Sequence, residues 1–230
     1  MQDPGISTIV RWRARPVAGF VEFCQTVMSF SVPQGPYIGS MHAKDTVKAQ
    51  LMDERDLERI LHRMSRQIVE MFAIDETAGA DFGLIGMQTR GVFLARRLAG
   101  LIRDIDGVDV PVGILDATMY RDDFRMRNRK PEVRETAIDF DIHDRHLVLV
   151  DDVLFTGRTV RSALDALMDM GRPASVHFLV MIDRGHRELP IEADFIGRRV
   201  PTLPGEEVRV RLSECDEREG VWLVDSGEAA

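Results

Sequence analysis

The spacing of apolar residues changes several times along the chain, and these changes predict where helices and strands lie. Between residues 57 and 71, apolar side chains recur every three or four positions, which predicts an amphipathic helix that ends at about Phe72. Asp53 stands at its start, where a carboxylate can accept a hydrogen bond from the first turn.

Short apolar runs alternate with helical patterns between residues 82 and 182. Strands that alternate with helices predict the α/β class, with a mainly parallel central sheet and helices on both of its faces. The apolar runs predict strands at 82–87, 110–115, 146–150 and 175–182, and the helical patterns predict helices at 92–102 and 159–170.

The last part of the chain follows a different pattern. Gly171 is expected to end the preceding helix. Residues 183–202 look irregular apart from a short strand near 193–196, whereas 208–212 and 221–224 alternate as antiparallel strands do.

The polar stretch 120–135 lacks apolar periodicity, so we expect a mobile loop or a loose hairpin there. Acidic residues dilute its charge, which leaves an ordinary solvated loop as the alternative. Its six basic residues are Arg121, Arg125, Arg127, Arg129, Lys130 and Arg134.

Residues 1–40 differ in composition from the rest, and we expect a poorly ordered N-terminal extension followed by a single domain over 41–230. Arginines ahead of the mildly apolar stretch 17–32 weakly imitate an export signal, but Glu22 and Gln25 interrupt that stretch. The alternative is upstream sequence from an over-early start codon, with Met41 or Met52 as the later start.

The net charge is −8, and 1–40 contributes +1 from three arginines against two acids, which leaves −9 for the remainder. An acidic body argues against a general nucleic-acid binder but allows a local basic face. Cys24 and Cys215 have no metal-ligand spacing and suggest a reducing compartment, so we expect the cytoplasm. No apolar stretch is long enough to span a bilayer, and no membrane partner is expected.

The stretch 147–159 has the pattern of a ligand-binding site. A buried strand runs into Asp151 and Asp152 and then into a Thr-Gly-Arg-Thr turn, residues 156–159, that opens a helix. Ligands bind beyond the carboxyl ends of parallel strands, and a helix N-terminus suits a phosphate. Gly157 allows close backbone approach, and the two carboxylates can accept hydrogen bonds from a ribose diol.

Other motifs fit this stretch poorly. Neither a Walker A loop nor a dinucleotide-binding G-x-G-x-x-G is present. The plain alternative is a solvated strand-to-helix loop with a threonine cap.

The stretch 147–159 resembles the motif with which type I phosphoribosyltransferases bind phosphoribosyl pyrophosphate (PRPP). Residues 86–91, 116–123 and 183–190 resemble one branch, the bifunctional PyrR family, which regulates bacterial pyrimidine operons and doubles as uracil phosphoribosyltransferase. The resemblance covers about 53–225 and implies a type I phosphoribosyltransferase-like fold with a small hood at about 183–202.

The resemblance also implies roles. Asp151 and Asp152 would bind the ribose hydroxyls, 156–159 would hold the 5-phosphate, and 89–91 would form a pyrophosphate loop. A cation at a helix start stands at the unfavourable end of the dipole, so Arg90 is expected to have an anion partner, the diphosphate. The stretch 120–135 would close over the diphosphate, and Mg²⁺ would arrive with PRPP without a predicted direct protein ligand. The implied catalytic residues are Asp151, Asp152 and Arg90, and the implied substrate contacts are Thr89, Arg90, Gly91, Asp151, Asp152, Val153, Leu154, Phe155, Thr156, Gly157, Arg158, Thr159, Arg121, Asp183 and His186.

The residue before the first threonine of the loop bears on which base is used. Purine-specific relatives carry an acid there, and this chain has Phe155, which favours a pyrimidine such as uracil under the hood. Orotate or a purine is the alternative. His186 is either a ligand contact or a structural turn residue.

The family's RNA contacts map onto five basic residues, which implies binding to the leader mRNA of pyrimidine genes in response to uridine nucleotides such as UMP. Glu192 stands where the family usually has an arginine and would repel phosphate. The alternatives are a regulator with little activity, or an enzyme without RNA binding. A homo-oligomer is expected. The five residues are His62, Arg63, Arg66, Arg187 and Arg198.

Overall fold

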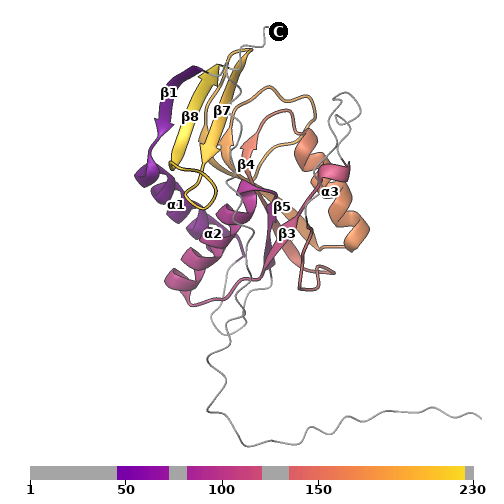
Figure 1. Cartoon of the computed structure of the whole chain (residues 1–230). Coiled ribbons are helices and arrows are strands. Elements are labelled where there is room, and N and C mark those ends of the chain that lie inside the picture. The colour runs from indigo at the N-terminus through magenta and orange to yellow at the C-terminus, as the bar shows by residue number, and fades with distance from the viewer. Residues whose placement is uncertain (1–45, 73–81, 121–134, 226–230) are drawn as a thin grey trace, which may run out of the picture. The chain divides into compact units, whose positions relative to one another are not determined.

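The structure, a computed structural model, describes residues 46–72, 82–120 and 135–225. A five-stranded parallel sheet lies at the centre (Figure 1). Its strand order is β3-β2-β4-β5-β6. Its strands are β2 (Phe82–Met87), β3 (Val112–Leu115), β4 (His146–Leu154), β5 (Ser175–Asp183) and β6 (Phe195–Arg199).

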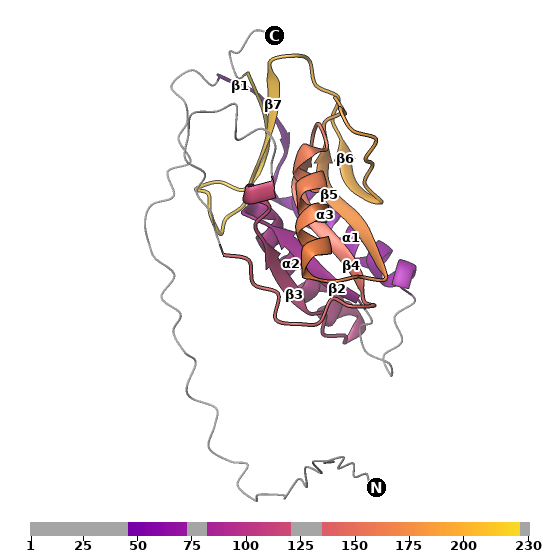
Figure 2. The same ribbon diagram turned by 90° about the vertical axis from the view of Figure 1, so that its right-hand side faces the viewer.

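Helices cover both faces of this sheet. The helices α1 (Glu54–Phe72) and α2 (Arg90–Asp106) share one core cluster with the sheet, and α3 (Arg158–Met170) belongs to a second cluster on the other face. Figure 2 shows α3 on the near side of the sheet and α1 behind it. A short 3₁₀ helix, η1 (Thr118–Tyr120), packs against α3. This arrangement confirms the expected α/β class.

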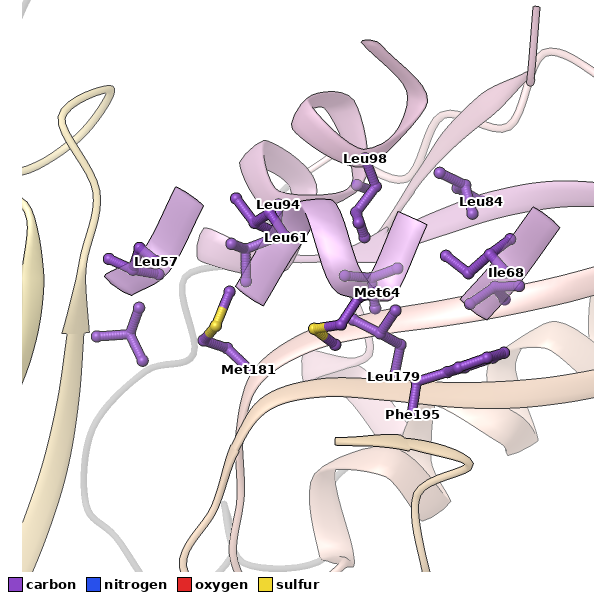
Figure 3. Close-up of a cluster of buried hydrophobic side chains, with 14 of the residues drawn as sticks. Leu57, Leu61, Met64, Ile68, Leu84, Leu94, Leu98, Leu179, Met181 and Phe195 are labelled. Atoms are coloured by element: carbon purple, nitrogen blue, oxygen red, sulfur yellow. The ribbon is translucent and has the colours of Figure 1, made fainter. Parts of the chain in front are cut away.

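The predicted apolar stripe of α1 is the buried face of that helix. Leu57, Leu61, Met64 and Ile68 are each at most 2% exposed, and Figure 3 shows them facing residues of α2 and of the sheet. Burying side chains of this size contributes roughly 1.5–3 kcal/mol each. Asp53 caps the helix as expected, because its Oδ1 accepts a hydrogen bond from the N–H of Asp56 at 2.8 Å.

A second, antiparallel sheet has the strand order β1-β8-β7. The strands β7 (Glu206–Arg211) and β8 (Gly220–Asp225) confirm the predicted pair near the C-terminus. The strand β1 (Thr46–Met52) was not predicted: Val47, Ala49 and Leu51 alternate with polar residues, but residues 46–50 are exposed, so the alternation marks no buried face. Its pairing with β8 is also irregular in register and joins residues about 170 positions apart, such as Met52 and Val221.

Several element bounds differ from the predictions. The strand β4 continues past Val150 to Leu154, because Asp151 and Leu154 still pair with Val180 and Asp183 of β5. The helix α2 continues to Asp106. The prediction stopped at residue 102 because the last turn is mostly polar and the apolar pattern ends before it. Gly107, with φ 68°, caps the helix in the left-handed conformation.

Gly171 ends α3 as expected, with its N–H bonded to Leu167 O, but in an extended rather than a left-handed conformation. The strand β3 begins at Val112, two residues later than expected. No helix in the described ranges is long and apolar enough to cross a membrane. The N-terminal extension 1–40, Cys24 and most of the basic stretch 120–135, including Arg121, lie outside the described residues.

We expect residues 1–40 to be dispensable for folding. A chain that begins at Met41 keeps all of β1, which starts at Thr46, so its melting temperature should equal that of the full chain in a thermal melt. A chain that begins at Asp53 lacks β1 and the fully buried Met52, and should melt several degrees lower. A lower melting temperature for the Met41 chain would show that the extension packs on the domain.

Candidate active site

The corner between β4 and α3 is built from very few residues. The strand ends at Leu154 and the helix begins at Arg158, so residues 155–157 alone connect them. Gly157 is the N-cap and lies in the left-handed region at φ 91°, where it has no side chain to satisfy the first turn. Thr156 Oγ1 accepts a long hydrogen bond, 3.4 Å, from the N–H of Arg158. The start of α3 therefore presents backbone donors and the positive end of its dipole.

The acidic pair belongs to the strand itself rather than to the loop, which corrects the expected strand end at Val150. Asp151 and Asp152 each accept a backbone hydrogen bond at 2.9 Å, from the N–H of Asp152 and the N–H of Val153 respectively. Burial raises the pKa of Asp152, and the nearby charge of Arg90 offsets this only in part. The carboxylate of Asp152 is thus removed from water and lies close enough to Arg90 to interact with its positive charge.

Two glycines bring the start of α2 against the strands. A Cβ on Gly91 would lie 2.3 Å from Val150 O, and one on Gly86 would lie 2.4 Å from the Cα of Val92. Both approaches are too close for any side chain. The predicted pyrophosphate loop, residues 89–91, therefore adjoins Asp151 and Asp152.

The structure gives Arg90 an anion partner within the chain. Its Nε and Nη2 donate to the two carboxylate oxygens of Asp216 at 3.1 and 2.8 Å. Burial disfavours the charge of Arg90, but the hydrogen bond to Asp216 and the negative charges of Asp216 and Asp152 together outweigh this and raise the pKa of the guanidinium. Sequence reasoning missed Asp216, and the only indication was an acidic run between the two C-terminal strands.

The hood segment 183–202 is bonded to the loop below it. Thr156 O accepts hydrogen bonds from the N–H groups of Glu188 and Leu189 at 3.0 and 3.2 Å. Glu188 also pairs with Arg158 at 2.6 Å. The hood therefore covers the start of α3, and Asp183 stands at its root.

Phe155 has a partner that the sequence did not suggest. Its ring is 40% exposed, and the guanidinium carbon of Arg184 lies 3.9 Å from the ring centroid. Arg184 is buried, donates to Thr202 Oγ1 at 3.3 Å and to Glu206 O, and has its pKa lowered by that burial. Phe155 and Arg184 together form an apolar and cationic shelf directly after β4.

His186 has the geometry of a turn residue. It adopts φ 60°, and its Nε2 is 2.7 Å from Thr202 O. Its exposed ring also meets Phe155 edge to face, with 5.9 Å between centroids. The structure thus supports the structural role for the imidazole and leaves its ring beside the shelf.

The five residues expected to contact RNA fall into two groups. His62, Arg63 and Arg66 are exposed on α1, and Arg63 donates to the carbonyls of Ile196 and Gly197 in β6. Arg198, on β6, donates to Leu51 O at 2.8 Å, so it joins this group.

Arg187 lies instead inside the hood. It donates to the carbonyls of Phe155, Gly185 and Ile191 at 2.7, 3.2 and 3.1 Å and pairs with Asp183. A cavity of about 300 Å³ lies beside it, lined by Asp183, Gly185, Arg187, Glu192, Ile196 and Arg199.

Comparison with known sequences identifies a family. Residues 48–212 match the model described as "Phosphoribosyl transferase domain". The "Bifunctional protein PyrR" of Listeria welshimeri is 49% identical over 181 residues, covering 77% of this chain and 97% of that protein. The protein of the same name from Pelotomaculum thermopropionicum is 50% identical over 181 residues (79% and 98%), and that from Thermus aquaticus is 50% identical over 176 residues (76% and 95%).

Solved structures with a similar fold include purine enzymes. A hypoxanthine-guanine phosphoribosyltransferase from Bacillus anthracis matches with a TM-score of 0.58 at 19% identity, over 77% of this chain and 98% of that one. The hypoxanthine phosphoribosyltransferase of Trypanosoma cruzi matches with a TM-score of 0.58 at 16% identity, over 77% and 96%. At these identities the likeness shows the type I fold and does not identify the base.

Proposed function

Because the chain belongs to the phosphoribosyltransferase family, and within it to the bifunctional PyrR proteins, we propose that it converts uracil and PRPP to UMP and diphosphate. The observation that carries this proposal is the corner between β4 and α3. There an acidic strand end, a left-handed glycine and a helix start whose N-cap has no side chain lie within nine residues, 151–159. This combination suits a sugar that carries both a diol and a phosphate.

PRPP would bind along this corner. Asp151 and Asp152 would accept hydrogen bonds from the ribose hydroxyls, and the backbone donors of 156–159 would hold the 5-phosphate. Val153 and Leu154 are the last residues of β4. They would contribute by setting the distance between the ribose-binding carboxylates and the phosphate-binding residues 156–159.

The pyrophosphate loop would bind the leaving group. Gly91 lets residues 89–91 lie against the strand end, and Arg90 is the charged donor of that loop. A guanidinium suits diphosphate because it offers charge-assisted hydrogen bonds in a planar array. The basic stretch 120–135, with Arg121, would close over the diphosphate and exclude water.

The residues present fit Mg²⁺ bound together with PRPP. Within the described ranges, no cluster of three or more His, Cys, Asp or Glu side chains could hold a metal by itself. Mg²⁺ commonly takes one or two carboxylates and completes its shell with substrate oxygens and water, and Asp151 and Asp152 can supply those carboxylates. When bound, the ion would neutralise part of the charge on the diphosphate.

The protein's part in the transfer is positioning and charge stabilisation. The bond from the sugar's C1 to the diphosphate breaks with its electron pair going to the diphosphate, uracil N1 forms the new bond to C1, and the N1 proton passes to water. The sugar becomes oxocarbenium-like in between, and a nearby carboxylate such as Asp152 stabilises that positive charge. Arg90 stabilises the negative charge that collects on the diphosphate.

Phe155 and the hood would select the base. Uracil is flat and apolar on its faces, and a ring at the position of Phe155 can pack against it. Phe155 also leaves no carboxylate there to exchange a proton with a purine nitrogen. Asp183 and His186 border this region, and both are already bonded within the hood.

A base panel tests the proposed reaction. We expect Mg²⁺-dependent nucleotide formation from PRPP with uracil, and at least tenfold less with orotate, hypoxanthine or guanine. Nucleotide formation is followed by chromatography, with omission of Mg²⁺ as the control. Preferred use of a purine would overturn the base assignment, and failure of PRPP to bind would overturn the reaction.

The bifunctional relatives support a second role. We propose that the chain also regulates pyrimidine genes by binding leader mRNA when uridine nucleotides are present. The α1–β6 surface, made of His62, Arg63, Arg66 and Arg198, would contact phosphates and loop bases of that RNA. We further propose that the protein works in the cytoplasm as a homo-oligomer, which light scattering would measure.

Arg66 provides the sharpest test of RNA binding. It is exposed and makes no hydrogen bond to the described residues, so Arg66→Gln removes a charge without loosening β6. We expect weaker leader-RNA binding in the presence of UMP and a salt dependence shallower by about one counterion. Arg103→Gln, which removes an exposed arginine at the other helix's end, is the control.

Glu192→Arg should tighten the same complex, because it removes a repulsive carboxylate near Arg187. If the wild type shows no preference for leader RNA over competitor RNA while uracil is still converted, the protein is an enzyme without the regulatory role.

A further inference from the structure

The connection between β7 and β8, residues 212–219, binds two arginines of α2. Arg90, in the first turn, pairs with Asp216. Arg97, seven positions further along the helix, pairs with Glu214 and Glu219. The connection lies beside α2 in Figure 1. It therefore ties the C-terminal antiparallel sheet to the helix that carries the pyrophosphate loop.

Asp216 is itself held in place. Its Oδ2 accepts hydrogen bonds from the N–H of Leu212 at 3.0 Å and from the thiol of Cys215 at 3.3 Å. Its own N–H donates to Leu212 O at 2.8 Å. The side chain is only 15% exposed. A carboxylate fixed by its own loop in this way can fix the partner that binds it.

Only one edge of the Arg90 guanidinium is used by Asp216. The hydrogen bonds to Asp216 leave from Nε and Nη2, and Nη1 makes none to the described residues. One third of the Arg90 side chain is exposed, 33%, and the carboxylate of Asp152 lies close enough to influence its charge. The second edge of the guanidinium therefore makes no hydrogen bond to the described residues and can donate to a bound anion.

Arg90 needs such a partner to stay where it is. It stands in the first turn of α2, which contains no acidic residue, and the helix dipole repels a cation there. Without Asp216 the long side chain would lose its fixed direction and gain rotamer freedom. A ligand would then have to order the side chain on binding, and this entropic cost would weaken its binding to Arg90.

We propose that Asp216 is a positioning residue for the transfer reaction: it holds Arg90 by one edge so that the other edge meets the diphosphate of PRPP. The inference rests on the proposed function, because it takes diphosphate as the ligand of 89–91. It assigns a task in the active site to a residue 126 positions away in the sequence, on a part of the chain outside the parallel sheet.

Asp216→Asn tests the proposal, with Glu214→Gln as the matched control. Glu214 also accepts two hydrogen bonds from an arginine of α2, from Nε and Nη2 of Arg97 at 2.8 and 2.7 Å. Arg97 lies about two helical turns further from the loop than Arg90. Both variants therefore lose one ionic, two-point contact between the same connection and the same helix. Only the loss of the Asp216 contact is expected to change ligand binding, because only Arg90 meets the ligand.

We expect Asp216→Asn to lower kcat/KM for PRPP about tenfold and to weaken Mg²⁺–diphosphate binding, measured by calorimetry, by a similar factor. Glu214→Gln should change both by less than twofold, because Arg97 lies two turns from the loop and keeps its contact with Glu219. In an Arg90→Lys background, Asp216→Asn should add little, because a lysine cannot make the two-point contact.

Three outcomes would overturn the proposal. The first is an Asp216→Asn variant with unchanged diphosphate affinity. The second is a tighter affinity, which would make Asp216 a competitor of the ligand. The third is equal losses in both variants, which would make the effect structural. Diphosphate binding needs no base, so a wild type that binds diphosphate but does not convert uracil would refute the base assignment alone.

Discussion

Replacing Asp152 by asparagine should lower kcat/KM for PRPP at least tenfold. Asparagine keeps the shape but removes the charge, and a hydrogen bond to a charged group contributes about 1.5–3 kcal/mol. The loss should fall mainly on kcat, because the carboxylate is worth most when the sugar carries positive charge. Steady-state kinetics with varied PRPP measures it, and Asp165→Asn, at a half-exposed acid on α3, is the control.

Asp152→Asn should not lower the stability of the fold at neutral pH, although it lowers activity. Burial raises the pKa of Asp152 in the folded state, so its ionised form disfavours the fold. That cost is absent below the ordinary carboxylate pKa and is fully present above the raised folded pKa. Asp152→Asn should therefore melt at an equal or higher temperature at neutral pH, with no gain at acidic pH. A clearly lower melting temperature at neutral pH would assign Asp152 a structural role.

Adding one methyl group at Gly91 should cost both stability and activity. The new Cβ would lie 2.3 Å from the carbonyl oxygen of Val150, so α2 or β4 must shift. Overpacking of this kind costs roughly 1–3 kcal/mol, and each kcal/mol lowers the melting temperature of a domain this size by roughly 2–4 °C. The shift would separate 89–91 from the acidic pair, so we expect at least a tenfold loss of kcat/KM.

Gly100→Ala is the matched control for this prediction. Gly100 lies in the middle of the same helix, and a Cβ there would meet nothing within 4 Å. Alanine is favoured over glycine in a helix interior by roughly 0.5–1 kcal/mol, so this variant should be slightly more stable and fully active. A harmless Gly91→Ala would show that α2 and β4 move apart easily and that their contact does not build the site.

The tertiary structure changes the interpretation of the arginines most. The sequence suggested an anion partner for Arg90 from the helix dipole alone, and the structure supplies one in Asp216. Arg187, expected among the RNA contacts, is instead bonded within the hood and to Phe155 O. Arg184 did not stand out at all, yet it stacks on Phe155.

The sequence by itself determined the features that depend on neighbours along the chain. Periodicity located the helix beginning at Glu54 and the strands of the parallel sheet, because a buried face imposes its spacing on consecutive residues. The motif of 147–159 pointed to the phosphate corner, because strand, acids, glycine and helix start are adjacent in the chain. The family could be identified for the same reason.

Only the tertiary structure decided which distant segments meet. Backbone pairing of β1 with β8, and of the end of β4 with β5, leaves little trace in side-chain pattern, because N–H and C=O groups are the same in every residue. The pairing of Arg90 with Asp216 is likewise invisible along the chain, since any acid of the C-terminal run could have served. Local pattern therefore predicted most of the elements and pointed to a ligand class, and long-range packing decided which charges face one another.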